Sequence, residues 1–176
     1  YGTTGIGDHV AVSLAGFYEN QDRPYGRNLV NNKPAVGADG NFGIKGTLLF
    51  EPSSKTEMRL AVDYMRTNDT TFYHIPQGVV GPDGVSTYPG RYNVSLSQDA
   101  FNKLRTGGAS LHVSQHLGSV SLVSISAYRK TLDHNGLDQD GTSAVVIDGD
   151  ISVRSSQLTQ ELQLQSDNNG PFKWTL

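Results

Sequence analysis

The strongest constraint on this chain is a nearly strict alternation of apolar and polar residues in its last part. Successive side chains of a β-strand point to opposite faces, so a period of two predicts a strand with one apolar side. The first strand of this stretch has an apolar row formed by Leu158, Leu162 and Leu164, with Gln160 as its exception. Residues 167–171 have turn chemistry, and the alternation resumes at Phe172. The stretch therefore predicts two strands joined by a short turn.

The same alternation recurs along most of the chain. It predicts further strands over residues 9–20, 41–50, 57–67, 108–117 and 120–131. In the first of these, Leu14 shares an apolar row with Val10 and Val12, whereas Ser13 and Ala15 belong to the other face. The segment 120–131 has two mixed rows, of which Val123, Ile125 and Ala127 form the more apolar one. The chain is thus expected to be all-β, with about seven strands.

The predicted connections alternate in length, and this is unusual for a sandwich. The long ones are 21–40, 68–107 and 132–152, and the short ones include 51–56 and 118–119. Antiparallel strands with long loops at one end and short turns at the other are typical of outer-membrane barrels. Inside the second long connection, residues 97–104 could form a short helix capped by Ser97.

Three motifs, in the right order along the chain, resemble TonB-dependent outer-membrane receptors. The longest resembles an early barrel hairpin, on Leu158, Gln160, Glu161, Leu162, Leu164, Ser166, Gly170, Pro171, Phe172 and Trp174. The segment 124–129, Ser-Ile-Ser-Ala-Tyr-Arg, resembles the preceding barrel strand. The segment 50–53, Phe-Glu-Pro-Ser, resembles a periplasmic turn of that family.

The resemblance implies that residues 1–176 are part of a single antiparallel transmembrane β-barrel domain, with long extracellular loops and short periplasmic turns. The plug domain and the remaining strands would lie outside this chain, which begins without Met and ends inside a strand pattern. It implies energy-coupled uptake of a scarce ligand, such as an iron–siderophore complex, across a bacterial outer membrane. The implied partners are outer-membrane lipid, the small extracellular ligand, and the TonB energy-coupling complex through the plug region. A passive porin and a soluble all-β binding domain remain the alternatives.

The composition of the chain disfavours several classes of protein. The net charge of −3 does not favour nucleic-acid binding, and the chain has no Cys, so disulfides and thiolate metal sites are excluded. No apolar run approaches the ~20 residues of a membrane-spanning helix. Each of these observations is compatible with an outer-membrane β-structure.

Catalytic and metal-binding patterns are weak, so neither an enzyme nor a cofactor is expected. No Gly-x-Ser-x-Gly elbow marks a nucleophile. His112 and His116 are four residues apart, a spacing that brings ligands together on a helix rather than on a strand, so polar lumen-facing residues are the preferred interpretation. Asp138, Asp140 and Asp148 lie near Asp-Gly turns but lack the full calcium-loop pattern, which favours turn chemistry.

The long connections carry the candidate ligand-binding residues. Aromatic rings and cations in one loop bind anionic or planar ligands by stacking and charge-assisted hydrogen bonds. The candidates in the first long connection are Arg23, Tyr25 and Arg27. Those in the second are Tyr73, His74, Arg91 and Tyr92. Packing of these loops on one another over the barrel mouth is the alternative explanation for the same residues.

Overall fold

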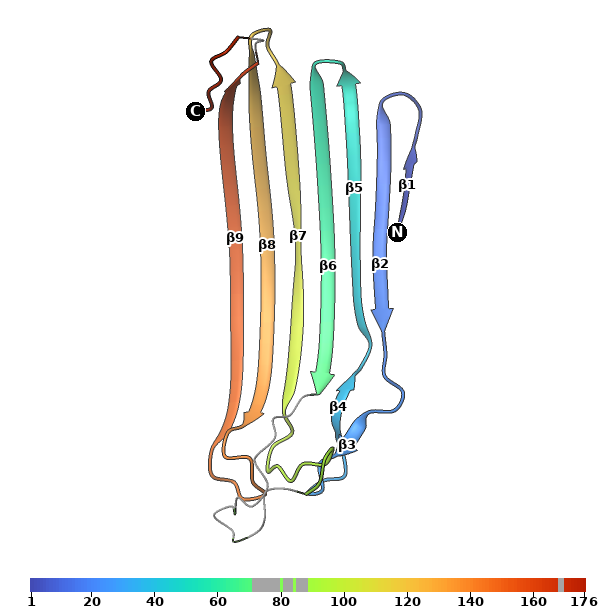
Figure 1. The fold of residues 1–176 in the computed structure, drawn as a ribbon, viewed down its shortest axis with the longest axis vertical. Coiled ribbons are helices and arrows are strands. Elements are labelled where there is room, and N and C mark those ends of the chain that lie inside the picture. The colour runs from blue at the N-terminus through green and yellow to red at the C-terminus, as the bar shows by residue number, and fades with distance from the viewer. Residues whose placement is uncertain (71–79, 81–83, 85–88, 168–169) are drawn as a thin grey trace.

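A computed structural model describes residues 1–70, 80, 84, 89–167 and 170–176. Within these residues the chain is all-β, with a nine-stranded antiparallel sheet and no helix. The path of hydrogen-bonded neighbours is β1-β2-β5-β6-β7-β8-β9 (Figure 1). Their bounds are β1 (Gly2–Gly5), β2 (Val10–Glu19), β5 (Asn41–Ser53), β6 (Thr56–Thr70), β7 (Phe101–His116), β8 (Val120–Asp138) and β9 (Asp148–Ser166).

Two short strands lie beside this path. β3 (Tyr25–Arg27) pairs with β4 (Pro34–Ala38), and β4 also pairs with the end of β6. Figure 1 shows both strands at the same end of the sheet as the β6–β7 and β8–β9 connections, with the tight turns at the opposite end. The predicted order of long and short connections is therefore confirmed, but the third long connection spans 139–147 rather than 132–152, because β8 and β9 extend into it. The sheet is open, with β1 and β9 at its two ends.

The register of the strands aligns the apolar residues in continuous rows across one side of the sheet. One row runs from Leu14 through Gly46, Val62, Ala109 and Tyr128 to Leu158. The next runs from Val12 through Leu48, Leu60 and Leu111 to Ser126 and Gln160. We call this side the apolar face. Its large side chains are solvent-exposed, with Leu14 at 58% and Leu158 at 79%.

The other side of the sheet, here called the polar face, carries many small and polar residues, together with apolar ones such as Phe17, Leu49 and Ile125. One of its rows runs through Ser13, Thr47, Ala61, Ser110, Ala127 and Thr159. The next row brings Asp63 to Arg129, whose guanidinium donates to both carboxylate oxygens at 2.7 and 3.1 Å. The face assignments predicted for Leu14 and Ser13 are confirmed, since register places them on opposite sides.

The predicted helix over residues 97–104 is wrong. Residues from Phe101 onward belong to β7, where Phe101 pairs with Thr70 and Leu104 with Thr67. Ser97 caps no helix; its hydroxyl donates to Asp148 at 2.7 Å, and its backbone amide donates to Asp138 at 2.8 Å. The long ladder with β6 satisfies the backbone groups that a short helix would leave unpaired at both ends.

The preferred apolar row of β8 is also wrong. Register places Val123, Ile125 and Ala127 on the polar face, and Leu122 and Tyr128 on the apolar face. This register lets Arg129 reach Asp63 on the polar face. Between Leu122 and Tyr128 on the apolar face lie Ser124 and Ser126. Gln160 of β9 pairs with Ser126, and its side-chain amide donates a hydrogen bond to the Ser124 hydroxyl at 3.1 Å.

The strand predicted from Phe172 onward forms only a short contact with the end of β9. Gln165 and Thr175 form an isolated antiparallel bridge, supported by backbone hydrogen bonds between Leu164 and Leu176 at 2.9 and 3.0 Å. The predicted hairpin is thus present in outline, with pairing limited to the residues around Thr175.

Buried apolar packing lies mainly outside the sheet. In the described part of the chain, the buried hydrophobic cluster consists of Ala35, Val94, Leu96 and Ala100, all near β3 and β4. None of the described residues forms a helix long and apolar enough to cross a membrane. We refer to residues 21–38 together with 89–100 as the loop cap.

Candidate functional site

The loop cap is held together by main-chain pairing between two segments far apart in sequence. Asn28 and Val94 form a parallel bridge, in which Val94 donates to the Arg27 carbonyl at 3.0 Å and Leu29 donates to the Val94 carbonyl at 2.8 Å. The Arg27 amide also donates to the Asn93 side chain at 3.0 Å. These bonds bring the first and second long connections side by side.

This pairing places candidate ligand-binding residues from both connections together. The rings of Tyr25 and Tyr92 lie 6.1 Å apart between centroids, tilted by 32°. The Arg91 guanidinium lies 5.4 Å from the centroid of Tyr92, within the range of a cation–π interaction. Tyr25, Arg91 and Tyr92 are exposed, so both rings and the cation are accessible to a ligand.

Gly26 allows the two loops to approach this closely. Its φ of +64° lies in the left-handed region, and a Cβ at this position would stand 1.4 Å from the Tyr92 carbonyl oxygen. Only glycine combines that conformation with the absence of a side chain. The Tyr25–Tyr92 contact therefore depends on the residue between Tyr25 and Arg27.

The remaining predicted ligand contacts are placed differently. The Arg27 guanidinium donates to the Asn32 carbonyl at 3.2 Å and to the Asn32 side chain at 3.0 Å, so it stabilises its own turn. Arg23 is exposed in the segment before β3, and its carbonyl accepts a hydrogen bond from Gln21 at 3.0 Å. Tyr73 and His74 lie outside the described residues.

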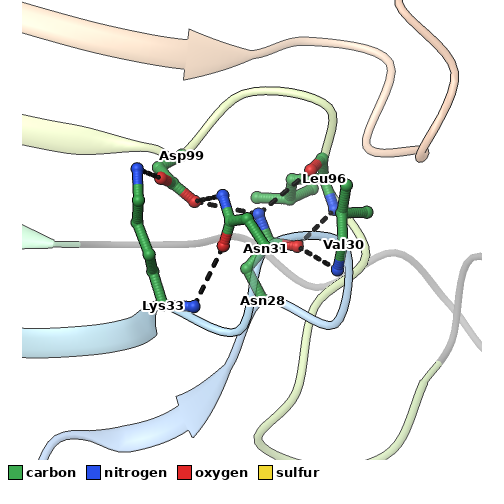
Figure 2. Close-up of polar contacts among 6 residues, drawn as sticks. All are labelled: Asn28, Val30, Asn31, Lys33, Leu96 and Asp99. Atoms are coloured by element: carbon green, nitrogen blue, oxygen red, sulfur yellow. Dashed lines mark hydrogen bonds and ion pairs between the residues drawn. The ribbon is translucent and has the colours of Figure 1, made fainter.

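A buried polar knot, which the sequence analysis did not identify, supports the cap (Figure 2). Asn28 is 1% exposed, and its amide donates to the Leu96 carbonyl at 3.0 Å and to Asp99 at 2.9 Å. Its side-chain oxygen accepts from the amides of Leu96 at 3.1 Å and Val30 at 3.2 Å. Asn28 therefore satisfies backbone groups from both loops at once.

Asp99 is the charged member of the knot. It accepts from Asn31 at 2.7 Å and forms an ion pair with Lys33 at 2.9 Å. Partial burial raises the pKa of Asp99, but hydrogen bonds from Asn31 and Asn28 and the charge of Lys33 outweigh this effect and hold the pKa below its ordinary value. The ionised carboxylate is thus the form that stabilises the knot.

Acidification should therefore loosen the knot. Because the folded-state pKa of Asp99 is depressed, its stabilising contribution is complete above the ordinary value of 3.8 and is lost as the pH falls through the depressed pKa. We expect the side-chain amide NMR signals of Asn28 and Asn31 to titrate together with a midpoint below 3.8. Asp99→Asn should remove this titration, whereas a midpoint above the ordinary value would contradict the assigned contacts.

A second acidic group lies where the β8–β9 connection meets the loop cap. Oxygens of Asp138, Asp140 and Asp148 lie within 4.8 Å of one another. These carboxylates accept hydrogen bonds, among them from the Gly141 amide to Asp138 at 2.7 Å and from the Ile147 amide to Asp140 at 2.9 Å. The Thr142 hydroxyl donates to Asp140 and lowers the pKa of Asp140. These contacts agree with the predicted turn chemistry.

The histidines of β7 and β8 lie on both faces of the sheet. His112 and His116 lie on the polar face, where His116 contacts Asp167 at 2.5 Å and Ser121 at 2.9 Å. Hydrogen bonds from His116 and Ser121 lower the pKa of Asp167. His134 lies on the apolar face and contacts Asp150 at 2.7 Å. Among the described residues, no group that could hold a metal ion includes a histidine.

Comparison of the chain with protein-family models, with curated proteins and with solved structures found no match. The functional interpretation therefore depends on the fold, the loop cap and the motif resemblance described above.

Proposed function

We propose that this chain forms part of the wall and outer mouth of an energy-coupled outer-membrane receptor, similar to TonB-dependent receptors. The observation that carries the proposal is the apolar face. Its exposed side chains extend in register from β2 to β9, and the structure contains no second layer over them among the described residues. An apolar patch of this extent marks a surface that contacts lipid or another apolar partner.

The arrangement of the two ends supports the same proposal. The tight turns would lie on the periplasmic side, and the loop cap would lie outside the cell. The polar face would line the lumen, where the Asp63–Arg129 ion pair is accessible to water. Coupling to the TonB complex would require the plug region implied by the family resemblance.

The accessible group of Tyr25, Arg91 and Tyr92 would capture the ligand. Two aromatic rings and a cation suit an anionic, partly planar molecule, and an iron–siderophore complex has this chemistry. The loop cap has its own small apolar core and polar knot, so these side chains are held in position before a ligand arrives. Such pre-organisation lowers the entropy cost of binding.

Single cysteines test the orientation, and the absence of native Cys makes the labelling unambiguous. Val145→Cys in the β8–β9 connection, where the native side chain is 81% exposed, should react with an impermeant maleimide on whole cells. Ser54→Cys, in the turn between β5 and β6, should react only after the outer membrane is permeabilised. The opposite pattern would reverse the topology. Labelling of both in a protein purified without detergent would favour a soluble domain.

Substitution of the capture group tests the receptor function itself. The double substitution Arg91→Ala and Tyr92→Ala should lower the apparent affinity for uptake of a radioiron-labelled ferric siderophore by about tenfold. The reason is that the stacking and cation–π contacts are lost. Val145→Ala with Val146→Ala, also in an exposed loop at this end, is the matched control. Protein abundance in the membrane should be equal for both variants. If uptake is the same with and without the Arg91 and Tyr92 substitutions, these residues are not part of the ligand site. Passive, energy-independent uptake would indicate a porin.

A further inference from the structure

A cluster of cations lies on the apolar face at its loop-cap side. We call Arg66, Lys103, Arg105, Lys130 and Arg154 the cationic band. Arg66 stands directly opposite Arg105 in the β6–β7 register. On the neighbouring strands, Lys130 is opposite Gly107, and Arg154 is opposite Leu132, the partner of Arg105. Alternation keeps all these side chains on the same side of the sheet as Tyr64 and Tyr128.

None of the ion pairs in the described part of the chain involves a cation of this band, although Lys103 lies 4.7 Å from the centroid of the Phe101 ring. The ion pairs there involve other cations: Lys33, Arg59, His116, Arg129 and His134. The carboxylate of Asp150, which lies on the same face, contacts His134 instead. Like charges placed directly opposite across two strands, such as Arg66 and Arg105, are destabilising. An anion bound between them would convert that repulsion into charge-assisted hydrogen bonds.

Two adjoining cavities lie beside the cations of the band. A cavity of about 270 Å³ is lined by Lys103, Arg105, Arg154 and His134, and also by Asp133, whose side chain alternation places on the polar face. A groove of about 510 Å³ is lined by residues that include Tyr64, Gly107, Tyr128 and Lys130. Both are bordered by Arg105 and Leu132. A site with an apolar groove at one end and cations at the other fits an amphiphile with an anionic head.

We propose that the cationic band binds the phosphate of a membrane lipid, with an acyl chain lying in the groove over Gly107. The inference depends on the proposed membrane location, because that location puts the band where the apolar rows end and lipid head groups begin. Arginine is well suited to phosphate, since its planar guanidinium can donate two parallel hydrogen bonds. The bound lipid would join β6, β7, β8 and β9 at their outer ends, below the loop cap.

The test uses the intact receptor in a neutral detergent and measures lipid binding by native mass spectrometry. Dioleoyl phosphatidic acid should bind, whereas dioleoylglycerol, which lacks the phosphate, and glycerol phosphate, which lacks the chains, should bind far more weakly. Arg105→Gln with Lys130→Gln should weaken phosphatidic acid binding by about thirtyfold, because each cation near a charged lipid surface contributes a factor of about five. Lys45→Gln with Arg59→Gln removes two cations from the polar face and should leave binding unchanged.

Each other outcome has a defined meaning. Equal binding of glycerol phosphate would assign the band to a soluble phosphate compound and overturn the lipid proposal. Equal binding of dioleoylglycerol, or unchanged binding after the Arg105 and Lys130 substitutions, would remove the cations from the site and overturn it as well. Heat-modifiable gel mobility of the same preparations reports membrane-type folding separately. A preparation that folds without detergent would contradict the receptor proposal. A preparation that folds in detergent but does not bind phosphatidic acid would contradict only the lipid-binding inference.

Discussion

Leu14→Arg should lower the free energy of unfolding of the membrane-inserted protein by ~2–4 kcal/mol, whereas Ser13→Arg should have a much smaller effect. Leu14 is 58% exposed on the apolar face, in the row with Gly46 and Val62. In the proposed membrane location, an arginine there would place its charge in hydrocarbon. Ser13 pairs with Thr3 and Thr47 on the polar face, where an added arginine would stay hydrated.

The measurement is urea unfolding in lipid vesicles, with heat-modifiable gel mobility as an independent report of folding. The two positions are adjacent on β2, so differences in strand position or depth cannot explain a difference between them. Greater damage from Ser13→Arg would mean that the apolar face does not contact lipid. Equally severe damage from both would mean that β2 is buried on both sides, which would favour a soluble all-β domain.

The face assignments of most strands could be predicted because they depend only on local alternation. On β2 and β9 the predicted apolar rows, which contain Leu14 and Leu158, lie on the same side of the sheet. A strand projects successive side chains to opposite sides whatever its partners are, so this information is present in each segment alone. The order of long and short connections followed once the strands were placed, whereas their lengths were overestimated, because β6, β7, β8 and β9 extend beyond the predicted ends.

β8 shows where local alternation stops being sufficient. Its rows are similarly apolar, so only the partners decide between them, and those partners lie on β7 and β9. Arg129 was the residue that could have corrected the assignment. Placing it on the polar face allows the ion pair with Asp63, whereas the opposite choice would have pointed it toward the apolar side.

The error over residues 97–104 has a related cause. Ser97 followed by Ala100, Phe101 and Leu104 is an acceptable helix start by local criteria. The structure uses the same residues to extend β7 against the outer end of β6, and Ser97 contacts Asp138 and Asp148 in the β8–β9 connection. Those partners are distant in sequence, so no local pattern reports them.

The candidate site was only partly predictable for the same reason. Aromatic and cationic residues marked both loops, but which of them meet is decided by the pairing of Asn28 with Val94. The polar knot joins residues 71 positions apart, Asn28 and Asp99, and both are ordinary loop residues when considered separately. The asparagines Asn31 and Asn32 beside Lys33 are the sequence feature that could have indicated it.

Asn28→Ala should lower the free energy of local opening of the loop cap by on the order of 2–3 kcal/mol, while the sheet stays folded. The buried amide and carbonyl of Leu96 would both lose their contacts with Asn28, and the space is too enclosed for free hydration. Unsatisfied buried polar groups cost more than the net value of the hydrogen bonds they replace. The effect should appear in amide hydrogen exchange at Leu29 and Val94, whose backbone bonds join the two loops.

Asn31→Ala provides the matched control, because Asn31 is an exposed asparagine in the same turn that also donates to Asp99. Its loss should cost only about 0.5–1.5 kcal/mol, since water can replace its contacts. Exchange at Leu60, within the β5–β6–β7 pairing, should be unchanged in both variants. In the proposed receptor function, Asn28→Ala should also weaken ligand capture more than Asn31→Ala does, because the Tyr25–Tyr92 contact is carried by the two loops that Asn28 joins. Equal exchange in the two variants would show that the buried position of Asn28 does not stabilise the cap. Faster exchange at Leu60 would show that the loop cap and the sheet unfold as one unit.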